Sequence, residues 1–300
     1  MTADDRTDVA GLTRWYEQTH GTGITQALDQ RLVYRETTQF QEIEVHDHAA
    51  FGRVLVLDGT VQLSQADEFV YHEMAVHVGL LGRRRDRARV LVVGGGDGGI
   101  VREVLRHPFV ERVVMVEIDE RVVEVSNRFL GVEGDYADSR ATLLYDDGLK
   151  YMKEAARAGE RFELIVIDAT DSTAPSKFLW TDSFYGDVAA CLADDGVAVD
   201  SDIIVQGRDG VRLSREPCEL SIVDIMRSGR FFGRVEAYQA RVPLYPGGFI
   251  FFLCSKDGWS YREPHAEFLG RYYNPRVHRG AFALPTWAHV ASRGKVGSAG

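Results

Sequence analysis

The sequence predicts an α/β protein in which a small antiparallel β-domain precedes a larger domain built on a parallel sheet. Three observations support this fold class. Short all-apolar runs alternate with segments of helical length from residue 90 onward, a glycine-rich turn follows the first run, and residues 40–63 alternate like strands between turns. We place the β-domain at 1–75 and the larger domain at 76–300.

Composition excludes several classes of protein. The chain has 300 residues, 45% of them hydrophobic and 27% charged, which is typical of a globular protein. Its net charge of -10 gives no electrostatic footprint for DNA or RNA and favours cationic partners. Three isolated cysteines indicate a reduced cytoplasm rather than a disulfide framework or a thiolate metal site. Because no signal-like N-terminus and no apolar run of about 18 residues occur, we expect neither targeting nor membrane insertion.

The N-terminal part has strand chemistry. Turn signals at His46–Ala50 and Asp58-Gly59 divide residues 40–63 into short alternating runs, which predicts an antiparallel meander. The apolar spacing then becomes mixed over Phe69–Leu81, where we expect a helix.

The larger domain begins with buried strands. Val90–Val93, Val113–Val116 and Leu164–Ile167 are all-apolar, end on glycine or an acid, and are separated by helical lengths. This alternation predicts parallel strands, and Phe249–Leu253 supplies a late strand.

The glycine-rich turn Gly94–Gly99 lies between the first strand and the helical stretch Ile100–Leu105. Glycines let the backbone approach a ligand closely, and Glu117, roughly 20 residues on, is placed to bind ribose hydroxyls. The motif predicts an adenosine-type ligand; the alternative is a glycine turn that merely packs.

Asp97 narrows the choice of ligand. A dinucleotide would place its pyrophosphate beside this carboxylate, which disfavours NAD. S-adenosylmethionine carries an amine that Asp97 could pair and a carboxylate that it would repel. A decarboxylated tail that ends only in an ammonium suits Asp97 best.

Further acids follow the other strands. Asp168 and Asp171 lie at the edge where open α/β sheets bind ligands, and could form a cation-binding or proton-accepting pair. Asp147-Gly148 follows another strand, and its acid could accept from an adenine amino group. The alternative for each acid is a helix cap or a turn.

A zinc site is not indicated. His72-Glu73 begins an HExxH-like pattern, but the next histidine is His77, one residue too late, and the sequence has no other ligand cluster. Core or surface helix positions are the alternative for both histidines.

Taken together, these motifs resemble the spermidine synthase family, the polyamine aminopropyltransferases, over nearly the whole chain. The matching segments are Trp15–Glu17, Thr38–Gln41, Val56–Gln62, Asp67–Met74, Gly94–Gly99, Arg102–Leu105, Glu117–Asp119, Asp147-Gly148, Asp168–Asp171, Pro243–Gly248, Ser255-Lys256, Tyr272–Asn274 and Val277–Arg279.

The resemblance implies a Rossmann-like domain of the methyltransferase kind, a homodimer or homotetramer, and transfer of the aminopropyl group of decarboxylated S-adenosylmethionine to an amine, putrescine above all. No metal or redox cofactor is implied. Asp168 would be the catalytic base. The donor-binding residues would be Gln41, Gln62, His72, Asp97, Glu117, Asp147 and Gly148, and the acceptor-binding residues Tyr71, Asp171 and Tyr245.

Two departures lie on the acceptor side. The segment Val199–Ile203 carries Asp200 and Asp202 where the family commonly has a glutamine-containing segment, and residues 168–175 read DATDSTAP where the family has a form closer to DSSDPxGPA. The two acids could set acceptor specificity or could face solvent. Cadaverine, agmatine and spermidine therefore stay open as acceptors.

The motifs also allow two other functions: methyl transfer from S-adenosylmethionine to a diamine, or an idle polyamine-binding homologue.

Overall fold

The structure is a computed structural model. It describes residues 8–9, 12–18, 25–132, 134–169, 179, 181–207, 210–213, 230–245 and 248–286. Within the described part of the chain, no helix is long and apolar enough to cross a membrane.

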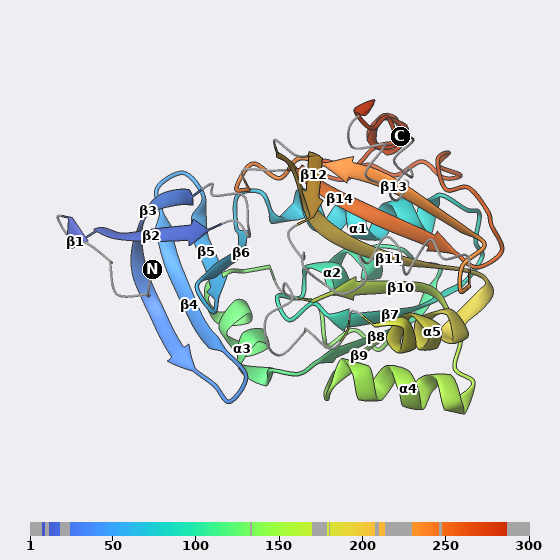
Figure 1. Cartoon of the computed structure of the whole chain (residues 1–300). Helices are drawn as coiled ribbons and strands as arrows, with labels where there is room; N and C mark the ends of the chain where they lie inside the picture. Colours follow the sequence, from blue (N-terminus) through green and yellow to red (C-terminus); the bar gives the residue numbers. More distant parts are fainter. Residues whose placement is uncertain are drawn as a thin grey trace, which may run out of the picture.

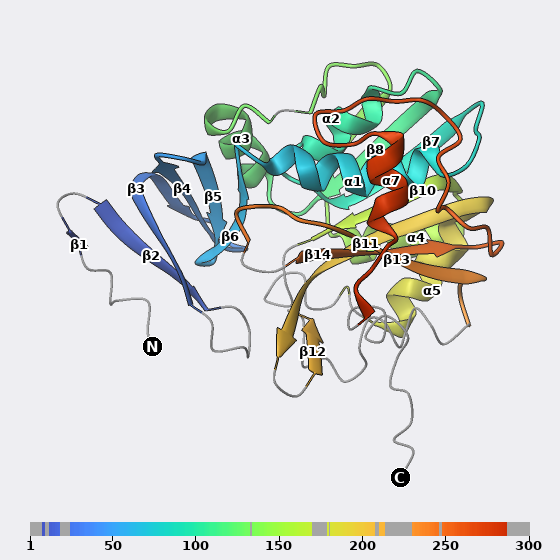
Figure 2. The same cartoon turned by 90° about the horizontal axis from the view of Figure 1, so that it is seen from above.

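An antiparallel sheet of six strands forms the N-terminal part of the described chain and lies at one end of the molecule (Figures 1 and 2). Its strands pair in chain order: β1 (Asp8–Val9), β2 (Leu12–Gln18), β3 (Thr25–Thr37), β4 (Glu42–His48), β5 (Gly52–Leu57) and β6 (Thr60–Ser64).

The predicted meander is confirmed as β4 to β6, with both pairs antiparallel. Asp58 and Gly59 connect β5 to β6 with positive φ at both residues, 48° and 75°, as a type I′ hairpin turn requires. The sheet is larger than this meander because β3 and the strands before it extend it.

The second sheet has eight strands among the described residues and carries the larger part of the chain. Its order is β13-β14-β11-β10-β7-β8-β9, and β12 pairs with β11. The strands are β7 (Ala88–Gly94), β8 (Val110–Glu117), β9 (Ala141–Tyr145), β10 (Phe162–Asp168), β11 (Leu192–Gly207), β12 (Gly210–Leu213), β13 (Arg234–Ala240) and β14 (Gly248–Ser255).

The five strands from β11 to β9 in this order are parallel, which confirms the predicted sheet. The late strand expected at Phe249–Leu253 is β14, which joins β11 and β13 in antiparallel pairs. The helices are α1 (Glu68–Leu81), α2 (Gly99–Leu105), α3 (Glu120–Phe129), α4 (Gly148–Ala158), α5 (Asp182–Cys191) and α7 (Pro275–Ala281).

Helices cover both faces of the parallel strands (Figure 1). Val90 and Val92 of β7 pack in the same cluster as residues of α1 and α2, whereas Leu91 and Val93 pack with residues of α4 and α5. Burial on both faces explains why the strand sequences are apolar without alternation.

The helix expected at Phe69–Leu81 is α1. Most of its residues are buried, including ten in succession from His72 to Leu81. A helix that is buried all round has no polar stripe, which explains the mixed apolar spacing. The boundary expected after residue 75 lies within this helix.

The order of the parallel strands reverses at β7 and β10. The chain continues from β7 to β8 on one side and from β10 to β11 on the other. Gly94 and Asp168, the last residues of these two strands, are paired in register. Crevices at such switch points are where open α/β sheets bind ligands.

Candidate active site

A cavity of about 210 Å³ opens at this switch point, between the N-terminal sheet and the carboxyl ends of the parallel strands. Ten of the thirteen residues expected from the sequence to form the site line it: Gln41, Gln62, Tyr71, His72, Asp97, Glu117, Asp147, Gly148, Asp168 and Tyr245. The fold therefore brings together side chains that are up to about 200 residues apart, as expected of a switch-point site.

The glycine-rich turn allows this close packing. Gly94 has a positive φ of 84°, and a Cβ atom there would lie 2.1 Å from the carbonyl oxygen of Asp168. A Cβ atom on Gly99 would lie 2.2 Å from Nδ1 of His72. A side chain on Gly94 would push β7 away from β10, and one on Gly99 would push α2 away from α1, so both glycines are needed for this packing.

An ion pair lines the cavity. Nε2 of His72 lies 3.1 Å from Oδ1 of Asp97, and the backbone N–H of Gly99 donates to the same carboxylate at 2.7 Å. Burial alone would raise the pKa of Asp97, but the charge of His72 and these hydrogen bonds hold it below its usual value. Asp97 is therefore ionised at neutral pH.

Asp168 lies beside this pair. A ring nitrogen of His72, a carboxylate oxygen of Asp97 and a carboxylate oxygen of Asp168 all lie within 4.8 Å of one another. The hydroxyl of Tyr71 donates to Oδ1 of Asp168 at 2.8 Å and lies 3.0 Å from Oγ of Ser201. Since a tyrosine hydroxyl has one proton, Ser201 is the donor to Tyr71 when Tyr71 donates to Asp168.

Glu117, the last residue of β8, also lines the cavity and is 8% exposed. Burial raises the pKa of Glu117 to about 7, although the backbone N–H of Asp119 donates to it at 3.0 Å. The amide of Gln41 donates to Asp119 at 3.2 Å, so the same acid orients both cavity residues. A carboxylate and an amide in this position can bind the hydroxyls of a sugar.

Asp147 combines the two interpretations that the sequence left open. It is the N-cap of α4, with its side chain accepting from the backbone N–H of Leu149 at 2.8 Å, and it also lines the cavity. His77 instead takes the core position offered as its alternative: it is fully buried and contacts His107 and Glu103.

Tyr245 joins the two parts of the fold. Its ring packs edge-on against Phe249, and its hydroxyl donates to the backbone carbonyl of Gln62 on β6 and lies 3.3 Å from that of Val61. The contact holds the N-terminal sheet against the segment after β13 and closes one wall of the cavity.

Three expected residues are not among the cavity-lining side chains. Asp171 lies outside the described residues, as does the side chain of Asp202. Asp200 is 2% exposed and accepts from the hydroxyl of Tyr185 at 2.5 Å, so the alternative in which it faces solvent is wrong. Successive strand residues point to opposite faces, which places Ser201 in the cavity and Asp200 away from it.

Glu68 and Ser201 are polar cavity residues that the sequence interpretation did not name as site residues. Glu68 lies one helical turn before His72, at a spacing that places the two side chains on one face of α1. That spacing was a usable signal. Ser201 had none, because its contact with Tyr71 joins residues 130 apart in sequence.

Fold and site together define an α/β protein of the Rossmann-like kind. It has a nucleoside-sized cavity at the switch point, lined by carboxylates and by His72, which pairs with Asp97. Residues 68–262 match the family described as the spermine/spermidine synthase domain, and residues 14–65 match the spermidine synthase tetramerisation domain.

Relatives and solved structures agree with this match. The chain is 38% identical to a polyamine aminopropyltransferase of Erwinia tasmaniensis, over 91% of this chain and 95% of the relative. It is 37% identical to that of Salmonella newport, over 93% and 97%. A spermidine synthase in complex with the transition state analogue AdoDATO has a TM-score of 0.80 at 28% identity, and the enzyme from Thermotoga maritima 0.76 at 27%; each comparison covers 93% of this chain and 94% of the other. This chain therefore belongs to the spermine/spermidine synthase family of enzymes.

Proposed function

We propose that the protein transfers the aminopropyl group of decarboxylated S-adenosylmethionine to putrescine, which yields spermidine and methylthioadenosine. The observation that carries this proposal is that Asp97, Asp168 and Glu117 line one cavity, with Asp168 and Glu117 as the last residues of β10 and β8. The cavity thus offers a carboxylate for a sugar, one for an ammonium and one for a proton.

The donor would bind across these three carboxylates. Its ribose hydroxyls would donate to Glu117, with Gln41, Asp147 and Gly148 around the adenosine, and its aminopropyl ammonium would bind Asp97 near Gln62 and His72. A carboxylate on the same tail would lie beside Asp97 and be repelled. This difference favours the decarboxylated donor and argues against methyl transfer from S-adenosylmethionine.

Asp168 is the proposed catalytic base. The acceptor amine is protonated in water, so one proton must leave before its lone pair can attack. The nitrogen then bonds to the donor carbon next to sulfur, the C–S bond breaks, and its electron pair goes to sulfur, which becomes a neutral thioether. The proton passes to Asp168, which Tyr71 orients through its hydroxyl.

The acceptor would occupy the side of Asp168 that faces Tyr71 and Tyr245, with Asp171 as a further proposed contact.

Relatives named polyamine aminopropyltransferase support an enzyme rather than an idle binding protein. The departure at Asp200 and Asp202 keeps cadaverine, agmatine and spermidine as possible acceptors beside putrescine. Asp200 would affect specificity through its neighbour Ser201, since its own carboxylate contacts Tyr185.

Three further proposals concern assembly, domain division and location. The match of residues 14–65 to a tetramerisation domain supports an oligomer, which we propose to be a homodimer or homotetramer. We keep the division at residue 75 and a cytoplasmic location as proposals.

The test is an incubation of the purified protein with decarboxylated S-adenosylmethionine and a panel of amines, with methylthioadenosine and the amine products quantified by mass spectrometry. We expect equal amounts of methylthioadenosine and spermidine from putrescine. Product only from a longer or guanidino amine would replace the acceptor, and methylated amine formed from S-adenosylmethionine would replace the reaction.

A further inference from the structure

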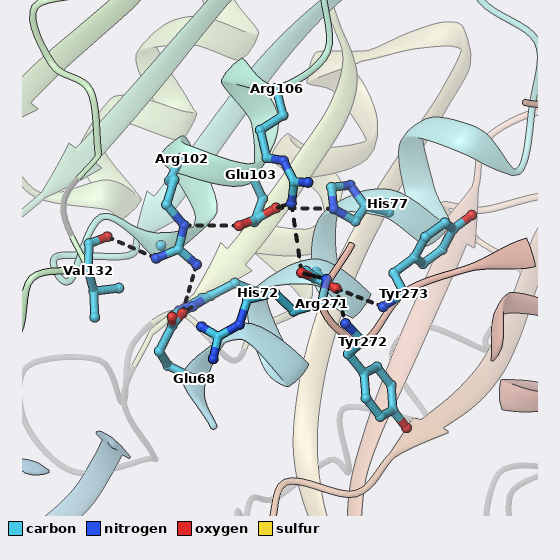
Figure 3. A network of polar contacts seen from close by, with 12 residues as sticks. Glu68, His72, His77, Arg102, Glu103, Arg106, Val132, Arg271, Tyr272 and Tyr273 are labelled. Atoms are coloured by element: carbon cyan, nitrogen blue, oxygen red, sulfur yellow. Dashed lines mark hydrogen bonds and ion pairs between the residues drawn. The ribbon is translucent and has the colours of Figure 1, made fainter. Parts of the chain in front are cut away.

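Behind the cavity residue His72, charged side chains of alternating sign continue through Glu68 and Arg102 into the protein (Figure 3). Oε2 of Glu68 lies 2.5 Å from Nδ1 of His72 and accepts from Nη2 of Arg102 at 2.8 Å. Arg102 also donates to Glu103 at 2.9 Å. Glu68 is 4% exposed, so its carboxylate is held by these two cations rather than by bulk water.

His72 has a carboxylate at each ring nitrogen, Glu68 at Nδ1 and Asp97 at Nε2. A neutral imidazole can donate from only one nitrogen, so two acceptor carboxylates select the imidazolium. Burial alone would lower the pKa of His72, but the two carboxylates raise it to about 10. The ring therefore keeps its positive charge in the physiological pH range.

The position of the ring is fixed on its remaining sides. Tyr71 packs edge-on against it with ring centroids 5.4 Å apart, and the backbone of Gly99 approaches so closely that no Cβ atom would fit. A ring held in this way can present Nε2 only toward Asp97. The orientation and ionisation of Asp97 thus depend on a carboxylate that lies on the far side of His72.

We propose that Glu68 is a positioning residue for the donor's ammonium: by holding His72 as a doubly donating imidazolium, it keeps Asp97 ionised and oriented in the cavity. This inference rests on the proposed function. Arg102 completes the device because it neutralises Glu68, so that the four groups from Asp97 to Arg102 carry alternating charges. An entering ammonium then finds a carboxylate whose position is already set.

The test compares Glu68→Gln with the wild type. Glutamine keeps the size and an acceptor oxygen but loses the charge. In long-range proton–nitrogen NMR spectra, we expect the wild-type His72 ring to carry both protons at pH 9. One adjacent charge moves a pKa by about 1–3, so Glu68→Gln should show a substantial neutral fraction at that pH. His72→Gln provides the assignment of the signals.

Binding gives the second readout. We expect Glu68→Gln to raise the Kd for decarboxylated S-adenosylmethionine about tenfold, the size of one charge-assisted hydrogen bond. The Kd for methylthioadenosine, which lacks the ammonium, should change less than about twofold. Glu103→Gln is the matched control: this buried carboxylate also bonds Arg102 but does not contact His72, and the control should alter neither readout.

Equal weakening of both ligands, or a His72 ring that stays doubly protonated in Glu68→Gln, would overturn the inference. Neither readout requires turnover. If the wild type shows no preference for the decarboxylated donor over methylthioadenosine, the proposed function fails; if that preference exists and Glu68→Gln leaves it intact, only the role of Glu68 fails.

Discussion

Replacing Asp97 by asparagine removes the charge proposed to recognise the donor while it keeps the shape of the side chain. The ammonium would lose a charge-assisted hydrogen bond, worth about 1.5–3 kcal/mol. This corresponds to an increase of about 10- to 150-fold in the Kd for decarboxylated S-adenosylmethionine. The imidazolium of His72, 3.1 Å away, would keep an acceptor oxygen at Nε2 but lose the opposite charge there, which adds to the effect.

Calorimetric titration of wild type and Asp97→Asn with both ligands measures this difference. Methylthioadenosine contacts the same adenosine end but has no ammonium, so its Kd should change less than about threefold. If both ligands weaken equally, Asp97 supports the glycine-rich turn through Gly99 rather than selecting the donor, and the reasoning is refuted.

Three further predictions concern other walls of the cavity. Burial raises the pKa of Glu117 to about 7, and ribose hydroxyls need its ionised form, so affinity for methylthioadenosine should rise with pH up to about 7 and then level off. In calorimetry, Glu117→Gln should bind methylthioadenosine more weakly and without this pH dependence. A flat pH profile for the wild type would contradict the assignment. Ser201→Ala removes the donor to Tyr71 and should lower kcat about fivefold, near 1 kcal/mol, at unchanged donor KM in steady-state assays. A change in KM alone would contradict a role of Ser201 in orienting Tyr71 during transfer. Gly94→Ala adds a Cβ atom 2.1 Å from the carbonyl oxygen of Asp168 at a positive φ, and should cost more than about 1 kcal/mol of stability; an unchanged Tm in thermal unfolding would contradict this packing.

Much of the fold could be predicted because burial on both faces marks the parallel strands. Val90–Val93 and Leu164–Ile167 were recognisable as apolar runs, and the rule that parallel strands end at one edge then placed Gly94–Gly99, Glu117 and Asp168 together. These placements needed no knowledge of long-range contacts.

The parts that escaped prediction lack such a periodic signal. β3 (Thr25–Thr37) is rich in polar residues, and only Leu28 and Gln30 are buried among its described side chains, so it resembles an exposed segment in sequence. The contact between Glu68 and Arg102 spans 34 residues, and its partners are ordinary helix residues when taken separately. Networks of this kind follow from how α1 packs against α2, which local pattern does not encode.

The central claim is that Asp168 accepts the proton in an aminopropyl transfer, and single-turnover experiments on wild type and Asp168→Asn test it most directly. With decarboxylated S-adenosylmethionine and putrescine, the wild type should form one methylthioadenosine per spermidine. Asp168→Asn should bind methylthioadenosine within about twofold of wild type and transfer at least about 100-fold more slowly. Transfer near the wild-type rate would contradict the account, and loss of methylthioadenosine binding together with transfer would mean that Asp168 is structural.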